Sequence, residues 1–224
     1  YRKYHTELGM PDADKFLQEA KDAAATIMGE SYSLNPNYLA AYNSDDLSKD
    51  QGEILLYKRY DAGLLMHSTI AYMYSSTVLN GLTKSAVDDY LCSDGKPISI
   101  SAEYQGDDGI ANVVANRDKR LLYTIDSTQL YYKGHVINTF TSSTGYRPTK
   151  FLKDTATLKT IPTGINTNVT DAPLFWLAEI YLIYAESAAE LDDMGKYTMT
   201  QEDLDNTINK LRARGGVAPM ILAG

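Results

Sequence analysis

The stretch FWLAEIYLIYAESAAEL, residues 175–191, is long and almost wholly apolar, yet it carries three glutamates. A membrane span needs about 20 consecutive apolar residues, and a carboxylate near the centre of a bilayer is costly. Glu179, Glu186 and Glu190 therefore disfavour a span. Counted from Leu177, apolar residues recur at helical spacing on most sides, which predicts an α-helix buried among other elements.

Capping signals predict the boundaries of this helix and of a partner helix. Asp171 can cap the first helix, and Pro173 would lie in its first turn, where a missing N–H costs nothing. Thr200 and Asp203 resemble a capping box for the second helix, which is expected to end at a pair of glycines. These signals predict an antiparallel helix pair over 171–216. The second helix carries a stripe of Leu204, Ile208 and Leu211, and the close-packing face of the first carries Ala185, Ala188 and Ala189.

The glutamates of the first helix need partners or water if they are buried, because an unpaired buried charge is costly. The second helix carries Arg212 and Arg214 in its last turn, where positive charge is favourable. We expect salt bridges from these arginines to Glu179 and Glu186 to tie the helix pair together.

Residues 1–30 predict another helix pair. Residues 1–9 look like the end of one helix, and 12–29 predict a second helix that Asp12 could cap. The inner face of the second helix is expected to carry Phe16, Ala20, Ala23, Ala24, Ile27 and Met28.

Residues 31–170 have a different character. They are rich in loop signals and show no long helical stripe. We therefore predict a loop-rich insert with a few short strands between two helix pairs, and a mainly α fold class. The expected strands are 53–60, 98–104, 121–125 and 136–141, and a short helix is expected at 83–90.

The composition excludes some classes of protein. A net charge of −8 disfavours nucleic-acid binding, which needs a basic surface. The single cysteine, Cys92, allows no internal disulfide and no cysteine metal cluster. The chain has 18 Tyr against 4 Phe and 1 Trp. Tyrosine suits both recognition surfaces and semi-polar cores, so both uses stay open.

No catalytic motif is present in the sequence. Its histidines, His5, His67 and His135, are far apart and form no HExxH pair. It also lacks the GxSxG, GxGxxG and P-loop motifs. Adjacent acidic residues such as Asp88 and Asp89 generally point apart. We therefore predict that the protein is not an enzyme and that it has no cofactor or metal site.

One polar cluster could be a site or a structural device. Asn116, Arg117, Asp118 and Arg120 lie within five positions of one another. Arginine can hold a carboxylate or backbone carbonyls through forked hydrogen bonds. We interpret the cluster as a device that orders the loop leading into 121–125.

Five stretches taken together resemble one family. YRKYH (1–5), GLTKSAVDDYLCSDGKPI (81–98), NRDKRLLYTI (116–125), TGYRPTKF (144–151) and the helix-pair region 173–216 occur in that order. Each stretch alone is weakly specific, but the ordered set resembles the SusD/RagB family of Bacteroidetes surface lipoproteins.

The resemblance implies a scaffold of tetratricopeptide-like helix pairs with an irregular, loop-rich remainder packed on it. Members of the family are considerably longer, so we expect residues 1–224 to be a single incomplete domain, the central fragment of a longer protein. Residues 217–224 would begin its missing carboxy-terminal part. Cys92 lies in the middle of the chain and does not fit a lipid-bearing cysteine.

The resemblance also implies a role. Members of the family are lipid-anchored on the outer face of the outer membrane, bind glycans or other nutrients, and act as a lid on a SusC-like, TonB-dependent transporter barrel. The chain would thus be a non-catalytic component of an uptake complex. Its partners would be that barrel and an oligo- or polysaccharide, with no nucleic acid. The alternative is a helical-repeat protein–protein interaction module without sugar binding.

One position departs from the family pattern. The long helix of the family usually begins with Arg before Leu-Ala-Glu, and this chain has Trp176 there. The change could be a structural variation or a contact point.

A sugar site needs an exposed aromatic platform for C–H faces and polar side chains for hydroxyls. Loop tyrosines in polar surroundings fit this need, and they lie in 67–80, in 104–105 before the turn GDDG, and in 131–132. The candidate ligand-binding residues are Tyr72, Tyr74, Asn80, Tyr104, Tyr131 and Tyr132. Packing of each tyrosine on the scaffold is the alternative.

Overall fold

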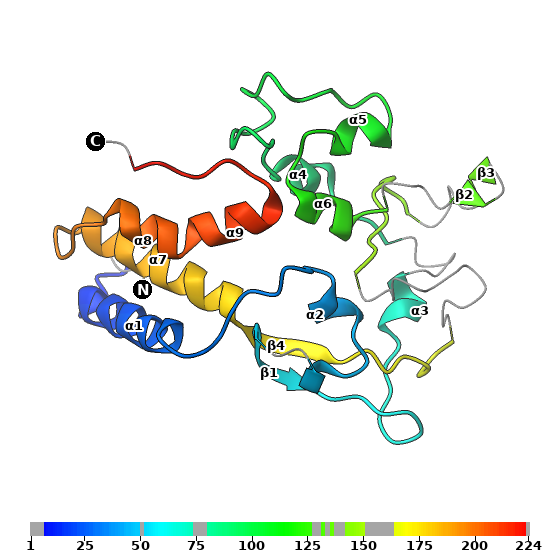
Figure 1. The fold of residues 1–224 in the computed structure, drawn as a ribbon, viewed down its shortest axis with the longest axis horizontal. Coiled ribbons are helices and arrows are strands. Elements are labelled where there is room, and N and C mark those ends of the chain that lie inside the picture. The colour runs from blue at the N-terminus through cyan, green and yellow to red at the C-terminus, as the bar shows by residue number, and fades with distance from the viewer. Residues whose placement is uncertain are drawn as a thin grey trace.

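The protein is mainly helical, as the sequence predicted (Figure 1). The computed structural model describes residues 7–49, 52–73, 80–126, 131–132, 135–136, 142–150 and 164–222. Within these ranges the strands form two small two-stranded antiparallel sheets. No helix in the described part of the chain is long and apolar enough to cross a membrane.

Three helical segments pack around the long helix α7 (Leu177–Asp193). Helix α1 (Ala13–Met28) lies along one side of α7, while α8 (Gln201–Asn206) and α9 (Ile208–Gly215) lie along the opposite side (Figure 1). This arrangement confirms the helix pair predicted at the carboxy-terminal end. The main core lies between these helices and consists of Ala24, Leu177, Ala178, Ile180, Tyr181 and Leu211.

One side of α7 is open, contrary to the expectation of a helix buried on most sides. Leu182 is 49% exposed and Ile183 is 37% exposed. Ala185 and Ala188 are buried at the close-packing face as predicted, but Ala189 is exposed. The reason is that α1, α8 and α9 cover only part of the circumference of α7.

The buried face of α1 agrees with the predicted one at Ala24, Ile27 and Met28 but differs from it near the start of the helix. Ala24 is buried as expected, but Phe16 is exposed, and Leu17 is buried in its place. Asp12 precedes α1 with a φ of 60° and makes no side-chain capping bond. The helix therefore begins where predicted but without the predicted cap, and its first turns bury Ala13 and Leu17 instead of Phe16. Residues 1–6, predicted to end an earlier helix, lie outside the described residues.

The predicted start of α7 is wrong, because residues 172–176 form a strand. Strand β4 (Ala172–Trp176) pairs antiparallel with β1 (Ile54–Lys58), which confirms the strand predicted at 53–60. Asp171 is fully buried and accepts hydrogen bonds from the Leu47 N–H at 2.9 Å and the Tyr60 N–H at 2.8 Å. Its carboxylate therefore joins loops to the sheet instead of capping a helix.

The second helix of the pair is interrupted. A capping box of Thr200 and Asp203 opens α8, and Gly216 ends α9 in a left-handed conformation, both as predicted. Thr207 lies between α8 and α9 with φ −127° and ψ −91°, which are not helical angles. Its hydroxyl donates to the Asp203 carbonyl at 2.5 Å. The hydroxyl therefore replaces the backbone N–H that would donate to this carbonyl in an unbroken helix.

The capping box should make stability depend on pH. Burial by itself raises the pKa of Asp203, but hydrogen bonds from Thr200, Tyr184 and Tyr197 outweigh it and hold the pKa below its ordinary value. A carboxyl with a lowered folded pKa stabilises above its unfolded value, about 4, and loses that contribution as pH falls through the folded value. Urea midpoints should therefore fall below about pH 4.

Asp203→Asn should flatten that decrease, because its side chain does not titrate. Asp193→Asn, at an exposed position at the end of α7, serves as the control. Equal slopes for the wild type and Asp203→Asn would show that the capping carboxylate does not carry the effect.

Two strands predicted in the middle of the chain are absent from the described structure, and one of them is replaced by a short helix. α6 (Lys119–Thr124) occupies the strand predicted at 121–125, and 98–104 consists of turns and irregular backbone. A short apolar run such as LLYTI fits a strand or a helix equally well, and the cap provided by Asp118 decides for a helix. α4 (Lys84–Asp88) confirms the helix predicted at 83–90.

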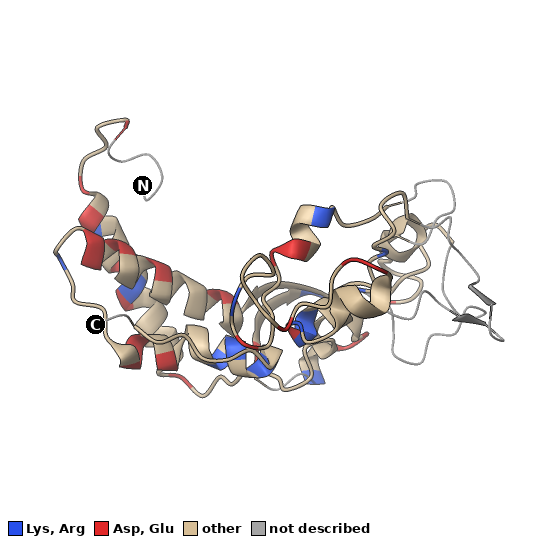
Figure 2. Cartoon of the chain, turned by 90° about the horizontal axis from the view of Figure 1, so that it is seen from above, with Lys and Arg blue, Asp and Glu red and all other residues tan. Residues whose placement is uncertain are grey.

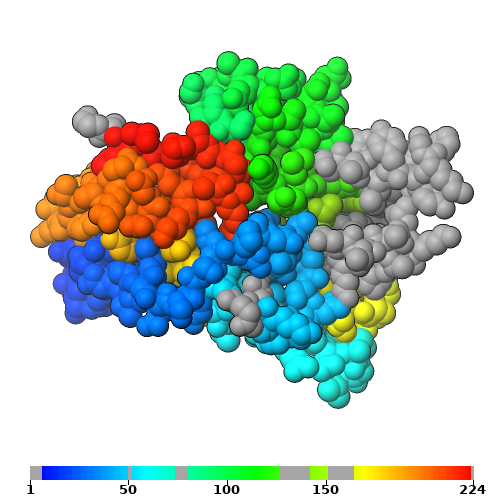
Figure 3. Space-filling view, viewed as in Figure 1, coloured from blue at the N-terminus to red at the C-terminus, as the bar shows by residue number. Residues whose placement is uncertain are grey.

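The other short elements are α2 (Ala40–Asn43), the 3-10 helix η1 (Leu47–Lys49), α3 (Thr69–Met73), α5 (Ile110–Val114), β2 (Tyr131–Tyr132) and β3 (His135–Val136). β2 and β3 form a hairpin, so the strand predicted at 136–141 is present at its first residue, and the rest lies outside the described residues. A second core joins α4, α5 and α6, whose segment forms the green lobe beside the end of α9 (Figure 3). That core consists of Val87, Val113, Leu121 and Ile125.

The arginines of α9 do not pair with glutamates of α7. Acidic residues spread along α1 and α8, whereas basic residues concentrate near the middle of the molecule (Figure 2). Arg212 donates to the carbonyls of Ala218 and Gly95, and Arg214 pairs with Glu53. The predicted ties to Glu179 and Glu186 are wrong, because both arginines point at segments beyond the helix pair.

Candidate functional site

A polar, partly aromatic cavity of about 490 Å³ lies between the second core and the loop before α2. Three chain segments form its lining. One precedes α2, one follows α4, and one opens α6. The residues that line it, called here the Tyr38 pocket, are Tyr38, Asp89, Tyr90, Leu91, Asp118 and Arg120.

Arg117 holds the wall that follows α4. Its guanidinium is buried and donates to the carbonyls of Val87 at 2.7 Å, Tyr90 at 2.7 Å and Val113 at 3.1 Å. These carbonyls lie at the ends of α4 and α5, where the last helical carbonyls have no partner within the helix. One side chain therefore connects the two helices and positions Asp89 and Tyr90, which confirms the structural interpretation of this arginine.

Asp118 and Arg120 form the opposite wall. Asp118 caps α6 by accepting from the Arg120 N–H at 2.9 Å, and it also accepts from the Arg120 Nε and Nη2. The backbone N–H of Asp118 donates to the Leu91 carbonyl at 2.9 Å, which brings the two walls together. A Cβ at Gly215 would lie 2.7 Å from Asp118 Oδ1, so only glycine allows α9 to approach this closely. The hydrogen bond to Asp118 raises the pKa of Arg120.

Tyrosines gather at one side of the pocket. The ring of Tyr38 stacks on that of Tyr123 with centroids 6.3 Å apart, and tilts against Tyr42 at 5.4 Å. The Lys150 ammonium lies 4.4 Å from the Tyr42 centroid and 5.4 Å from that of Tyr38. Burial, with Tyr38 close by, raises the pKa of Tyr42 well above its ordinary value. The Tyr42 hydroxyl therefore stays un-ionised at neutral pH.

A buried ion pair supports the tyrosines from below the surface. The Arg214 Nη1 lies 2.7 Å from both carboxylate oxygens of Glu53, and its guanidinium lies 5.4 Å from the Tyr38 centroid. Glu53 also accepts from the Asn35 N–H at 3.0 Å. Tyr38 is thus held between the scaffold helix α9 and the pocket.

The pocket offers the chemistry that sugars need. Ligand pockets of this size usually combine apolar and aromatic walls with a few placed polar groups. Here tyrosine rings can contact C–H faces, while Asp89 and Arg120 can bind hydroxyls. No group of three or more potential metal ligands occurs among the described residues.

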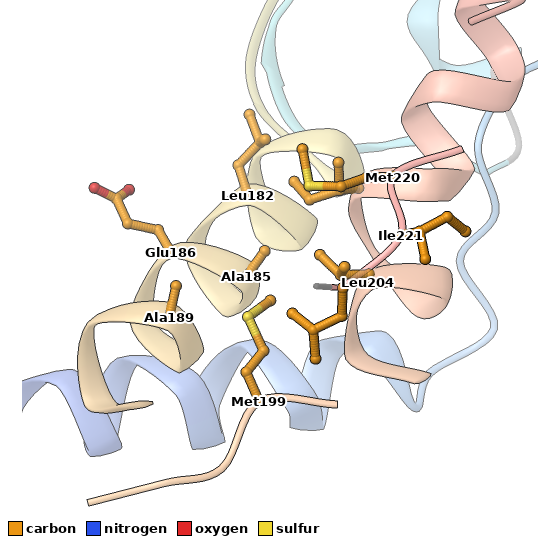
Figure 4. A pocket seen from close by; sticks show the side chains of 10 residues that line it. Leu182, Ala185, Glu186, Ala189, Met199, Leu204, Met220 and Ile221 are labelled. Carbon is orange, nitrogen blue, oxygen red and sulfur yellow. The ribbon is translucent and has the colours of Figure 1, made fainter. Parts of the chain in front are cut away.

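A second hollow has a different character. The apolar groove, of about 510 Å³, lies between α7, α8, α9 and residues 220–222 (Figure 4). Leu182 and Ala185 point into it from α7, and Glu186 points away at its edge (Figure 4). Its lining offers few hydrogen-bonding groups and does not suit a sugar. The groove is lined by Leu182, Ala185, Glu186, Ala189, Met199, Leu204, Ile208, Met220, Ile221 and Leu222.

The comparison with protein families decides the identity of the chain. The model of the SusD family matches residues 65–223. The chain belongs to the SusD family. SusD family proteins are non-catalytic binding proteins, which confirms the prediction that the chain is not an enzyme. A comparison with curated proteins gave no match.

Solved structures share the SusD fold of this chain. A SusD-like carbohydrate binding protein from Bacteroides fragilis is 21% identical with a TM-score of 0.68, and the match covers 94% of this chain and 43% of that chain. A SusD superfamily protein from Parabacteroides distasonis is 17% identical with a TM-score of 0.53, covering 94% and 41%. A further SusD-like protein from Bacteroides fragilis is 17% identical with a TM-score of 0.58, covering 94% and 45%. The chain therefore spans less than half the length of these proteins.

Two predicted binding residues of this SusD family chain lie side by side. Tyr72, on α3, is 54% exposed, and the Asn80 Nδ2 donates to its carbonyl at 3.0 Å. Neither residue lines the Tyr38 pocket. Tyr74 lies outside the described residues. A role of Tyr72 and Asn80 in binding stays a prediction.

The other predicted residues lie elsewhere. Tyr104 donates to Asp107 and contacts the Arg117 guanidinium at 5.4 Å, while burial and then the Asp107 carboxylate raise its pKa to about 12. Tyr131 and Tyr132 form strand β2, and their side chains lie outside the described residues. The contacts of Tyr104 tie it to the scaffold, while ligand binding by these tyrosines stays a prediction.

The sequence reasoning missed the Tyr38 pocket as a site. Its arginine and one aspartate were interpreted only as a structural pair, and Tyr38 was not singled out. A signal was available, because Tyr38 and Tyr42 are four positions apart just after an Asn-Pro turn. Trp176, the departure from the family pattern, packs against the main core, which gives it a structural role.

Proposed function

We propose that this chain carries the ligand-binding part of a surface nutrient-binding protein, and that the Tyr38 pocket takes an oligo- or polysaccharide. The observation that carries the proposal is the pocket itself, in which aromatic rings lie beside a carboxylate and a guanidinium. Membership of a family of binding proteins supports it. A solved structure of the same fold is described as a carbohydrate binding protein, which supports a sugar over other nutrients.

Tyr38→Ala in the full-length protein should weaken binding of the preferred oligosaccharide about tenfold, a loss of about 1.4 kcal/mol. The reason is that the ring supplies the contact area for the apolar face of a sugar. Isothermal titration against a panel of neutral oligosaccharides measures the effect. Tyr38→Phe keeps the ring and should bind nearly as the wild type does.

Tyr32→Ala is the matched control, because Tyr32 is exposed and lies outside the pocket lining. Tyr72→Ala tests the surface predicted from sequence in the same assay. If Tyr38→Ala binds the oligosaccharide as tightly as the wild type and Tyr72→Ala binds it more weakly, the binding site lies at α3 and not in the Tyr38 pocket. Thermal melting of each variant separates lost binding from lost folding.

We also propose that the full-length protein sits on the outer face of the outer membrane and pairs with a TonB-dependent transporter barrel of the SusC type. The family match supports this arrangement. Affinity purification of the tagged protein from solubilised outer membranes should recover the barrel. Protease treatment of intact cells should cleave the protein. Protection of the protein in intact cells would contradict the outward-facing location.

The second candidate function is a helical-repeat module that binds protein and no sugar. The observation in its favour is the apolar groove, whose lining provides apolar contact area with few hydrogen-bonding groups. The two functions differ in one outcome. A full-length protein that binds no oligosaccharide in the panel, but recovers a barrel from membranes, would favour the second.

A further inference from the structure

The Tyr38 pocket contains a carboxylate that has no partner among the described residues. Asp89 follows α4, and its backbone N–H is used within that helix end. Its side chain is exposed, and among the described residues it makes no hydrogen bond and no ion pair. A carboxylate of this kind can accept several hydrogen bonds from a ligand.

Arg120 has free hydrogen-bonding capacity on the edge that Asp118 does not use. Its Nε and Nη2 donate to Asp118, whereas Nη1 has no acceptor among the described residues. A guanidinium carries five N–H donors in a fixed planar fork. The edge that contains Nη1 can therefore donate to ligand oxygens while the other edge stays on Asp118.

The charges of the pocket lining do not cancel. Asp118 and Arg120 neutralise each other, which leaves the Asp89 carboxylate as the unpaired charge among the lining residues. Neither Arg117, which donates to backbone carbonyls beside Asp89, nor any other nearby cation pairs with Asp89 among the described residues. Arg214 pairs with Glu53, and Lys150 lies over the rings of the tyrosine cluster. A ligand that carries its own negative charge would therefore meet repulsion from Asp89.

We propose that the Tyr38 pocket selects uncharged sugar units over uronic-acid or sulfated ones, with hydroxyls donating to Asp89 and ligand oxygens accepting from Arg120. This inference rests on the proposed function, because it concerns the ligand of the same pocket. Neighbouring hydroxyls of a sugar can each act as donor and acceptor, so one ring edge satisfies both groups. The carboxylate or sulfate group of an acidic sugar can accept from Arg120 but has no proton to donate to Asp89.

The test compares neutral and acidic oligosaccharides of matched length on the full-length protein. Neutral gluco-, xylo-, manno- and galacto-oligosaccharides form one set, and oligogalacturonates and chondroitin sulfate oligosaccharides form the other. Dissociation constants are measured by isothermal titration at low salt, because screening weakens exposed charge effects. The wild type should bind its best neutral ligand at least about tenfold more tightly than any acidic one, a difference in free energy that pocket electrostatics can supply.

Two substitutions assign the selectivity to Asp89. Asp89→Asn keeps the shape but accepts weaker hydrogen bonds, so neutral binding should weaken several-fold. Asp89→Lys should weaken neutral binding further and strengthen acidic binding. Asp193→Asn, at an exposed carboxylate at the far end of α7, is the matched control and should change neither. The exposure of Asp89 makes loss of folding an unfavoured explanation, and thermal melting checks it.

The outcomes separate the selectivity from the function. Wild-type protein that binds acidic oligosaccharides as tightly as neutral ones, or more tightly, overturns the selectivity and leaves sugar binding intact. Neutral binding that neither Asp89 substitution changes also overturns it, because the carboxylate then takes no part. No binding to either set overturns the proposed function itself.

Discussion

Arg117→Ala should destabilise the protein by about 3–5 kcal/mol, because the carbonyls of Tyr90 and Val113 lose their donor and each buried carbonyl left without one costs about 1–3 kcal/mol. The side chain is 4% exposed and donates to three carbonyls at 3.2 Å or less, those of Val87, Tyr90 and Val113. Methylene contacts are lost as well. Because these carbonyls end two helices of the second core, we expect α4 and α5 to separate in the variant.

Urea unfolding followed by circular dichroism measures this loss. Arg117→Lys keeps the charge but not the planar fork, so it should recover only part of the stability. Arg59→Ala is the control, since Arg59 is exposed and its ion pair with Asp61 lies at the surface; such pairs are worth about 0–1 kcal/mol. A loss for Arg117→Ala no larger than that of the control would mean that the carbonyls find other donors.

The same substitution should also affect binding. Arg117 holds the wall that presents Asp89 and Tyr90 to the pocket, so a displaced wall weakens the ligand contact without any direct contact from Arg117. Oligosaccharide affinity should therefore fall in Arg117→Ala under conditions in which the protein is still folded.

Glu53→Ala should cost about 3–5 kcal/mol, because it leaves a buried guanidinium without its counter-charge. Both side chains of the Glu53–Arg214 pair are buried, and Arg214 Nε already lacks an acceptor in the described structure. The backbone of Glu53 also receives the first N–H of α7, from Leu177, at 2.8 Å. The pair therefore joins β1, α7 and α9 at one point.

A double substitution separates two contributions to the free energy of unfolding. One is the net contribution of the ion pair, and the other is the cost of leaving one of its charges buried and unpaired. Replacing Glu53 and Arg214 together with leucine removes both charges and fills part of the space, and such replacements are often neutral or stabilising. The double variant should therefore be more stable than Glu53→Ala in urea unfolding. A double variant that is less stable than Glu53→Ala would mean that the ion pair itself contributes net stabilisation. The loss in Glu53→Ala would then not come from the unpaired guanidinium.

The long helix could be predicted from sequence because its information is local. Apolar spacing over 177–191 predicts a helix, and α7 covers Leu177–Asp193. The start of the helix could not be predicted in this way. Asp171 and Pro173 form an acceptable helix start by propensity, but pairing with β1 holds 172–176 extended. Tertiary contacts overrode a weak local preference.

The candidate site also combines a feature that could be predicted from the sequence with one that could not. The role of Arg117 as an organiser of its loop followed from the chemistry of arginine, and the structure confirms it. Polar surroundings point to the tyrosines of the predicted surface, but Tyr38 also lies in a polar stretch, so this local criterion does not single it out. Its pocket neighbours come from positions 89–120, which no local pattern connects to it.

By itself, the sequence determined the long helix, the capping box before α8, the loop-rich middle, the absence of catalytic motifs and the resemblance to the SusD/RagB family. These features depend on residue type and on spacing within a few turns of the chain. Only the tertiary structure decided which face of α7 stays open, that Glu53 meets Arg214 across 161 positions, and that Tyr38 faces Asp89 and Arg120. The physical reason is that such contacts form only when distant segments close onto one another, and that closure depends on the packing of the whole chain rather than on any local preference.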